Sequence, residues 1–93
     1  MKVSFYASLR QAAGQKSIEV PYANGLTVAE LLREILQAVP LLEREIMDDD
    51  GQLHEHIHIL VNGRDLRYLQ GGLDKTLAEE DQVSLFPAIS GGV

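Results

Sequence analysis

The feature that most constrains the fold is one long amphipathic helix, predicted between residues 27 and 39. Thr27, followed three positions later by Glu30, is the pattern of a capping box, in which each residue satisfies a backbone N–H of the other. Apolar residues then recur at helical spacing until Pro40, namely Val28, Leu31, Leu32, Ile35, Leu36 and Val39. An apolar stripe of this length needs a complementary apolar surface elsewhere in the chain.

Four further segments alternate apolar and polar residues, as strands with one buried face do. They are residues 2–7, 17–20, 56–61 and 82–86. In the first segment Val3 and Phe5 share one face and Tyr6 lies on the other, and in the last Phe86 faces outward before Pro87 ends the strand. A turn at residues 13–16 predicts that the first two segments form a β-hairpin.

The shorter elements are less regular. Residues 41–47 could add a short helical stretch, and residues 48–51 form a polar turn. Asn62 and Gly63 are the signal for a tight turn, and one short strand is expected around Arg67 and Tyr68.

This order of elements predicts an α+β fold. A mixed sheet of four to five strands would pack on one main helix, with the first and last strands side by side and parallel. That is the order of a β-grasp fold. We expect residues 1–87 to form the domain and residues 88–93 to form a flexible tail.

The chemical content of the chain excludes several classes of function. It contains no cysteine, so disulfides, thiolate catalysis, iron-sulfur ligation and cysteine-ligated zinc are excluded. The formal net charge of −6 argues against nucleic acid as a partner, because phosphate binding needs clustered Lys and Arg. No apolar run resembles a membrane span or signal peptide, so we expect a cytoplasmic protein with no membrane partner.

The last residues carry the pair Gly91-Gly92 and then Val93. Between residues 87 and 93 the terminal carboxylate is the only ionisable group, and no side chain there is an acid or a base that could activate the Ser90 hydroxyl. Two successive glycines form a thread narrow enough to enter another protein's tunnel. A frayed terminus would contain the same residues, so the pair by itself is weak evidence.

Three apolar residues fall on the outward phase of three strands, Tyr6, Leu60 and Phe86. If these strands adjoin, the three residues, together with Pro87, form an apolar patch suited to partner docking, which we call the docking surface. The alternative is that they are scattered or covered surface residues.

Three histidines at a spacing of two residues could suggest a metal site. His54, His56 and His58 would share one strand face, but consecutive same-face residues lie roughly 6.5 to 7 Å apart, which permits two ligands at best. Residues 48–51 lack the spacing of a calcium loop. We therefore predict a solvated strand face and no metal site.

Four segments together resemble the MoaD/ThiS family of ubiquitin-like sulfur carriers. They are residues 3–10, 59–65, 73–77 and 81–92, and the last contains Phe86-Pro87 and Gly91-Gly92. The likeness covers nearly the whole chain and is greatest to the MoaD-like branch, which includes carriers for molybdopterin and cysteine biosynthesis.

The resemblance implies a carrier that is a cosubstrate and not itself an enzyme. An E1-like enzyme would use ATP to adenylate the Gly92 carboxylate, which then becomes a thiocarboxylate, and Gly91 would be its neighbour in the tunnel. The sulfur would pass to an enzyme such as a molybdopterin synthase large subunit or a cysteine synthase. The carrier itself would bind no cofactor.

Val93 departs from this pattern, because members of the family that act directly end at the second glycine. Either a peptidase removes Val93 first, or the chain is inactive as written, or the residue is an addition. Two other functions stay open: a modifier joined through Gly92 to lysines of target proteins, and a non-covalent β-grasp binding module with an inert tail.

Overall fold

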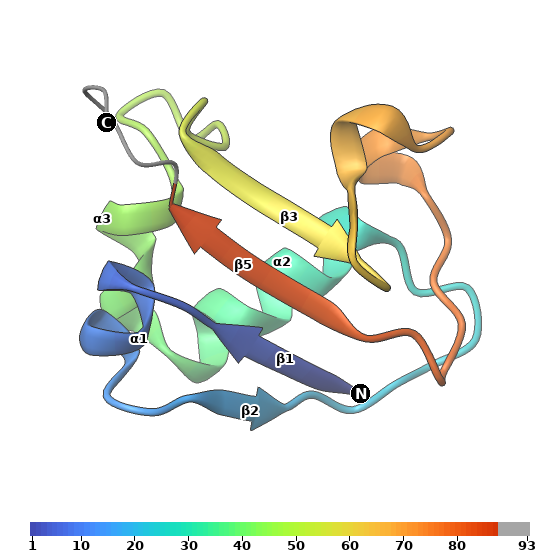
Figure 1. Cartoon of the computed structure of the whole chain (residues 1–93), viewed down its shortest axis with the longest axis horizontal. Helices are drawn as coiled ribbons and strands as arrows, with labels where there is room; N and C mark the ends of the chain where they lie inside the picture. The colour runs from blue at the N-terminus through green and yellow to red at the C-terminus, as the bar shows by residue number, and fades with distance from the viewer. Residues whose placement is uncertain (88–93) are drawn as a thin grey trace.

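One layer of the molecule is a five-stranded mixed sheet (Figure 1). The strands are β1 (Lys2–Phe5), β2 (Ser17–Glu19), β3 (Ile57–Val61), β4 (Arg64–Asp65) and β5 (Val83–Pro87). Their order across the sheet is β2-β1-β5-β3-β4, with β1 parallel to β5 and every other neighbouring pair antiparallel. The structure is a computed structural model that describes residues 1–87.

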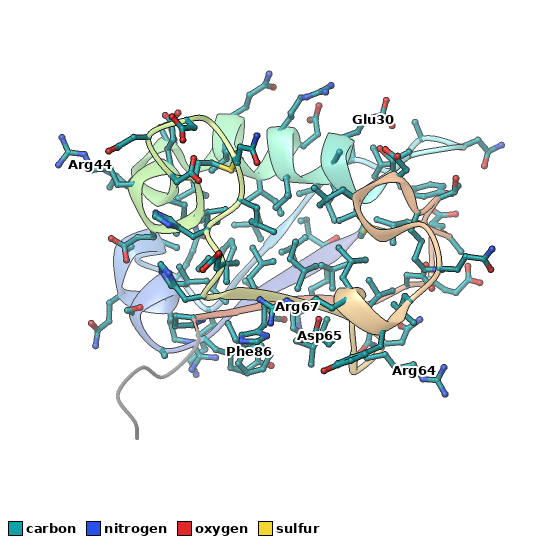
Figure 2. The ribbon with its side chains drawn as sticks, turned by 90° about the horizontal axis from the view of Figure 1, so that it is seen from above. Glu30, Arg44, Arg64, Asp65, Arg67 and Phe86 are labelled. Atoms are coloured by element: carbon teal, nitrogen blue, oxygen red, sulfur yellow. The ribbon has the colours of Figure 1, made fainter. Side chains whose placement is uncertain are left out.

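The second layer consists of helices that cover one face of the sheet. They are α1 (Ser8–Ala13), α2 (Val28–Ala38), η1 (Pro40–Leu42) and α3 (Glu43–Ile46), and two 3₁₀ turns, η2 (Leu66–Tyr68) and η3 (Gly72–Asp74), follow β4. Seen along the layers, α2 lies on one side of the sheet, and the side chains of Asp65 and Phe86 lie on the opposite side (Figure 2). The sheet therefore has one covered face and one open face.

The predicted capping box begins α2. The backbone N–H of Glu30 donates to Thr27 Oγ1 at 3.2 Å, and the backbone N–H of Thr27 donates to Glu30 Oε1 at 2.9 Å. The apolar stripe of the helix is buried at Val28, Leu31, Leu32 and Ile35. The second predicted helical stretch is also confirmed, by η1 and α3.

The core lies between α2 and the covered face of the sheet. The inward residues of the three central strands are all buried, namely Val3, Phe5, Ile57, Ile59, Val61, Val83 and Leu85. Burying one side chain of this size contributes about 1.5–3 kcal/mol. The apolar residues that alternate along these strands therefore face the helices, and the residues between them lie on the open face.

The first two strands pair as predicted, but a helix connects them. β1 and β2 are antiparallel, with Val3 opposite Ile18. Between them, α1 begins after Ala7, whose φ of 53° and ψ of −130° turn the chain sharply, and it ends at Gly14 with a φ of 73°. α1 is not predicted by the sequence pattern, because the helix is short and no side chain caps its start.

The short strand expected around Arg67 and Tyr68 is wrong. Asn62 and Gly63 both have positive φ, 54° and 83°, and this two-residue turn pairs Val61 directly with Arg64. The short strand of this region is therefore β4, which comes directly after the turn and before Arg67. Asp65 Oδ1 then accepts a hydrogen bond from the backbone N–H of Arg67 at 2.9 Å, which turns the chain into η2.

A mixed sheet packed on one main helix is the α+β β-grasp arrangement predicted from the order of elements. The parallel pairing of β1 with β5 is confirmed, with Val3 opposite Val83 and Phe5 opposite Leu85. Across residues 1–87, no helix has both the length and the apolar character that crossing a bilayer would require.

Candidate functional site

The open face of the sheet brings together the outward residues that the sequence singled out. Tyr6 follows β1, and its backbone N–H donates to Leu85 O on β5 at 3.2 Å, so its side chain lies beside that of Phe86. On the other side of β5, Phe86 is opposite His58 of β3. Leu60 lies two residues farther along β3 and so faces the same way.

An aromatic stack is the main feature of this face. The rings of Tyr6 and Phe86 have centroids 4.3 Å apart and planes 2° from parallel. Arg10 of α1 contributes a cation, with Cζ 5.1 Å from the centroid of the Tyr6 ring. Its Nε donates to Phe5 O at 3.0 Å, which holds the guanidinium in place.

A hydrogen-bonded pair lies next to the stack. His58 Nδ1 and Asp65 Oδ2 are 2.9 Å apart, and both side chains are half-buried. The hydrogen bond from the backbone N–H of Arg67, and after it the hydrogen bond with His58, lower the pKa of Asp65 below its ordinary value of 3.8. Asp65 therefore provides a fixed negative charge at one side of the open face.

Pro87, the fourth residue predicted for the docking surface, is the half-buried last residue of β5 and lies opposite the inward residue Ile57. It is therefore on the covered phase of the strand, and the open face holds only Tyr6, Leu60 and Phe86 of the predicted docking residues. The residues predicted to carry the chemistry, Gly91, Gly92 and Val93, lie outside the described residues.

The expected arrangement of three histidines on one strand face is wrong. β3 begins at Ile57, so His54 and His56 precede the strand, and only His58 belongs to it. The rings of His54 and His56 lie against each other with centroids 4.6 Å apart, whereas His58 pairs with Asp65. Within residues 1–87, no three metal-binding side chains gather at one place.

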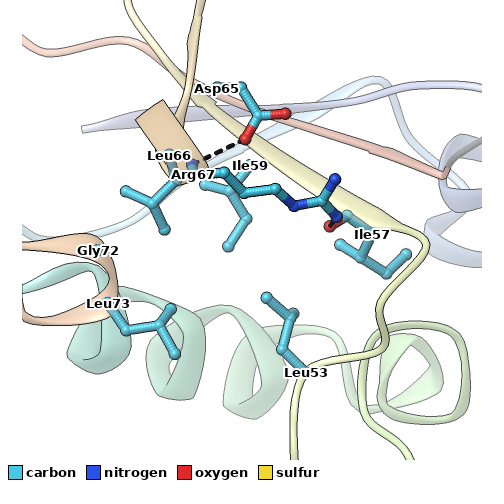
Figure 3. Close-up of a pocket in the computed structure, with 8 residues that line it drawn as sticks. All are labelled: Leu53, Ile57, Ile59, Asp65, Leu66, Arg67, Gly72 and Leu73. Atoms are coloured by element: carbon cyan, nitrogen blue, oxygen red, sulfur yellow. Dashed lines mark hydrogen bonds between the residues drawn. The ribbon is translucent and has the colours of Figure 1, made fainter. Parts of the chain in front are cut away.

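A small apolar pocket, which the sequence pattern does not predict, lies on the covered side of the sheet. Its volume is about 210 Å³, and Leu53, Ile57, Ile59, Leu66 and Leu73 supply its apolar lining (Figure 3). Arg67 crosses its edge, and its Nη2 donates to the carbonyls of Glu55 and Ile57. Leu53 lies outside the helices and strands and Leu73 lies in the short turn η3, so no periodicity could have revealed the pocket.

This pocket is not arranged as an active site. Its ionisable side chains, Asp65 and Arg67, are engaged with His58 and with backbone groups. Both charged side chains of this pocket therefore already have partners.

Comparison with known proteins gives matches along nearly the whole chain. Residues 3–92 match the model of the ThiS family. Small archaeal modifier protein 1 of Haloferax volcanii is 34% identical over 92 residues, which are 99% of this chain and 100% of the relative. Sulfur carrier protein CysO of Mycobacterium tuberculosis is 33% identical over 81 residues, which are 85% of this chain and 83% of the relative.

Solved structures share the same arrangement of helices and strands. The crystal structure of SAMP1 from Haloferax volcanii superposes with a TM-score of 0.87 at 34% identity, covering 99% of this chain and 98% of that one. CysO in the Amycolatopsis orientalis BexX/CysO complex gives a TM-score of 0.77 at 29% identity, covering 98% of each chain. The match of sequence and fold over nearly the full length shows that this chain belongs to the ThiS family and has its ubiquitin-like β-grasp fold.

Proposed function

We propose that this chain is a sulfur carrier that works through the carboxylate of Gly92. An E1-like enzyme adenylates this carboxylate after cleavage of the Gly92–Val93 bond, and a thiocarboxylate is then formed. The observation that carries the proposal is the family match, which extends through Gly91 and Gly92. A relative named a sulfur carrier protein supports the same role.

The chemistry explains why such a carrier needs an activating partner. A carboxylate is a poor electrophile, so one of its oxygens first attacks the α-phosphate of ATP and pyrophosphate leaves. A sulfide nucleophile then displaces AMP from the acyl adenylate, which leaves sulfur in place of one carboxyl oxygen. ATP belongs to the activating enzyme, and the carrier contributes its terminus and a surface that the enzyme recognises.

The docking surface is the part of the described structure that suits this recognition. Tyr6 and Phe86 supply a preformed aromatic stack, Leu60 extends it across the open face, and Pro87 directly precedes the segment with the two glycines. A partner bound here would be in reach of that segment. Aromatic residues presented in this way are common at the centres of protein interfaces.

The second partner in the proposal is an enzyme that accepts the sulfur. The BexX/CysO complex, in which a chain of similar fold is bound to another protein, supports this kind of assembly. A molybdopterin synthase large subunit and a cysteine synthase are both consistent with the carrier role. A peptidase that cleaves after Gly92 completes the set of proposed partners.

A modifier function is the second candidate, and the relative named a small archaeal modifier protein favours it. The activated Gly92 would then be joined to lysines of target proteins. Both functions share the adenylation step, and they differ in the final acceptor.

Intact-mass measurement of the protein from its native cells tests both functions. A carrier should lose Val93 and exchange one carboxyl oxygen for sulfur, and the sulfur should be absent in cells that lack the E1-like enzyme. Peptides with lysine linked to Gly92 would instead support the modifier. A mass that ends at Val93 under every condition, without adducts, would contradict both and leave the non-covalent binding module.

A further inference from the structure

Both asparagines of the chain are followed by glycine, at Asn24-Gly25 and Asn62-Gly63. The two pairs are alike in most respects: all four residues are exposed, and both glycines have positive φ, 84° and 83°. A Cβ at either glycine would meet no atom within 4 Å, so water reaches both peptide bonds. On sequence and exposure alone, the two sites should behave identically.

They differ in how the asparagine amide is held. Asn62 Nδ2 donates to Asp81 Oδ1 at 2.9 Å, and Asn62 Oδ1 accepts from the backbone N–H of Gln82 at 2.9 Å. The backbone N–H of Asn62 also donates to Gln82 O at 2.8 Å. The side chain of Asn62 is therefore fixed between the β3–β4 hairpin and the segment before β5.

Asn24 has no such restraint. Its turn is closed by one backbone hydrogen bond, from Leu26 N–H to Ala23 O at 3.0 Å. Within residues 1–87, no hydrogen bond involves the side chain of Asn24. Its amide can rotate freely toward the main chain of Gly25.

We propose that Asn24 is a site of spontaneous deamidation, and that the hydrogen bonds of Asn62 protect the second site. The backbone nitrogen of Gly25 attacks Asn24 Cγ, a C–N bond forms, and the Cγ–Nδ2 bond breaks. Ammonia leaves with the proton from the Gly25 amide, which produces a succinimide. Water then opens the ring to aspartate or isoaspartate, and no oxidant or reductant is needed.

The isoaspartate product would disturb a connection of the fold. It adds one carbon to the main chain between residues 24 and 25, close to the start of α2. There, Leu26 O accepts from the backbone N–H of Leu77 at 2.8 Å, and Thr27 forms an isolated bridge with Thr76. A shift of Leu26 would weaken this connection, so the isoaspartate fraction should unfold at a lower temperature than fresh protein.

Peptide mapping separates the two sites. The folded protein is incubated in mildly alkaline buffer and digested with trypsin, which places Asn24 in peptide 17–33 and Asn62 in peptide 45–64. Conversion of an amide to an acid raises the mass of a peptide, whereas isomerisation at Asp50-Gly51 leaves the mass of peptide 45–64 unchanged. We expect Asn24 to deamidate about tenfold to a hundredfold faster than Asn62. Asn62 must first break two side-chain hydrogen bonds, and two bonds of ordinary net strength correspond to a factor of this size.

Two controls make the result decisive. In urea the hydrogen bonds of Asn62 are lost, so the two rates should converge. In the folded Asp81→Ala variant, Asn62 loses its acceptor and should react faster while Asn24 keeps its rate. Equal rates in the folded wild-type protein, or an Asn24 that reacts only in urea, would overturn the proposal.

Discussion

The rings of Tyr6 and Phe86 stack in parallel, with centroids 4.3 Å apart, across the only parallel strand pair of the described sheet. Neither residue contributes to the buried core, so the stack is available to another protein. If partners dock here, Phe86→Ala should weaken binding of the E1-like enzyme about tenfold or more, because truncating an aromatic residue at an interface hot spot costs about 2 kcal/mol or more. Titration calorimetry with the cognate enzyme would measure the change.

The matched control for this prediction is Leu41→Ala. Leu41 is 77% exposed, but it belongs to η1 in the helical layer. Its removal should leave the affinity unchanged. Equal losses of affinity in the two variants would argue against the docking surface.

Replacing Ala7 by glycine should stabilise the fold. Ala7 has a φ of 53° and a ψ of −130°, a conformation that side chains with a Cβ rarely adopt. Glycine relieves this strain but also loosens the unfolded chain, so the net gain should be about 1 kcal/mol in the free energy of unfolding. Urea denaturation measures the gain. Ala12→Gly, inside α1, should instead lose about 1 kcal/mol, and a loss at both positions would contradict the reasoning.

Asn62→Ala should destabilise the protein by about 1–3 kcal/mol. The substitution removes both side-chain hydrogen bonds of Asn62, to Asp81 and to the backbone of Gln82. It also places alanine at a φ of 54°, where asparagine is better tolerated. Asn24→Ala is the control and should change the free energy of unfolding by less than about 0.5 kcal/mol. Similar values for the two variants would mean that the Asn62 hydrogen bonds contribute little.

Asp65 should contribute stability that is lost in acid. Its folded pKa lies below the ordinary value of 3.8, so the folded state favours the ionised carboxylate. The contribution is complete above that value and disappears as the pH falls through the folded pKa. Asp65→Asn should therefore be less stable than wild type at neutral pH, and the difference should shrink in strong acid. A stability difference that stays the same from neutral pH to strong acid would contradict this account.

The elements that the sequence predicted well are those in which burial repeats regularly. Alternation placed β1, β3 and β5, because their inward residues, such as Phe5, Ile59 and Leu85, are fully enclosed by the core. The Thr27–Glu30 pair marked the start of α2, because a capping box is a local interaction that needs no tertiary context. Tyr6, Leu60 and Phe86 were predicted to lie on the open face because they alternate with these inward residues.

The elements that the sequence pattern does not predict, or predicts at the wrong place, are those whose structure depends on tertiary contacts. α1 has only Leu9 fully buried and no side-chain cap, so its six residues carry almost no periodic signal. β4 is two residues long, and its position follows from the turn geometry at Asn62. Arg10 was not singled out, because its contact with Tyr6 depends on how α1 packs beside the end of β1.

The central position of β5 determines when the chain can fold during its synthesis on the ribosome. β5 comes after all the other strands in the chain, yet it lies between β1 and β3. While the ribosome is still synthesising residues 83–87, β1 and β3 have no strand between them, and their inner edges remain unpaired. Folding must therefore wait until this segment has emerged, and until then the nascent chain exposes strand edges that chaperones or other chains can bind.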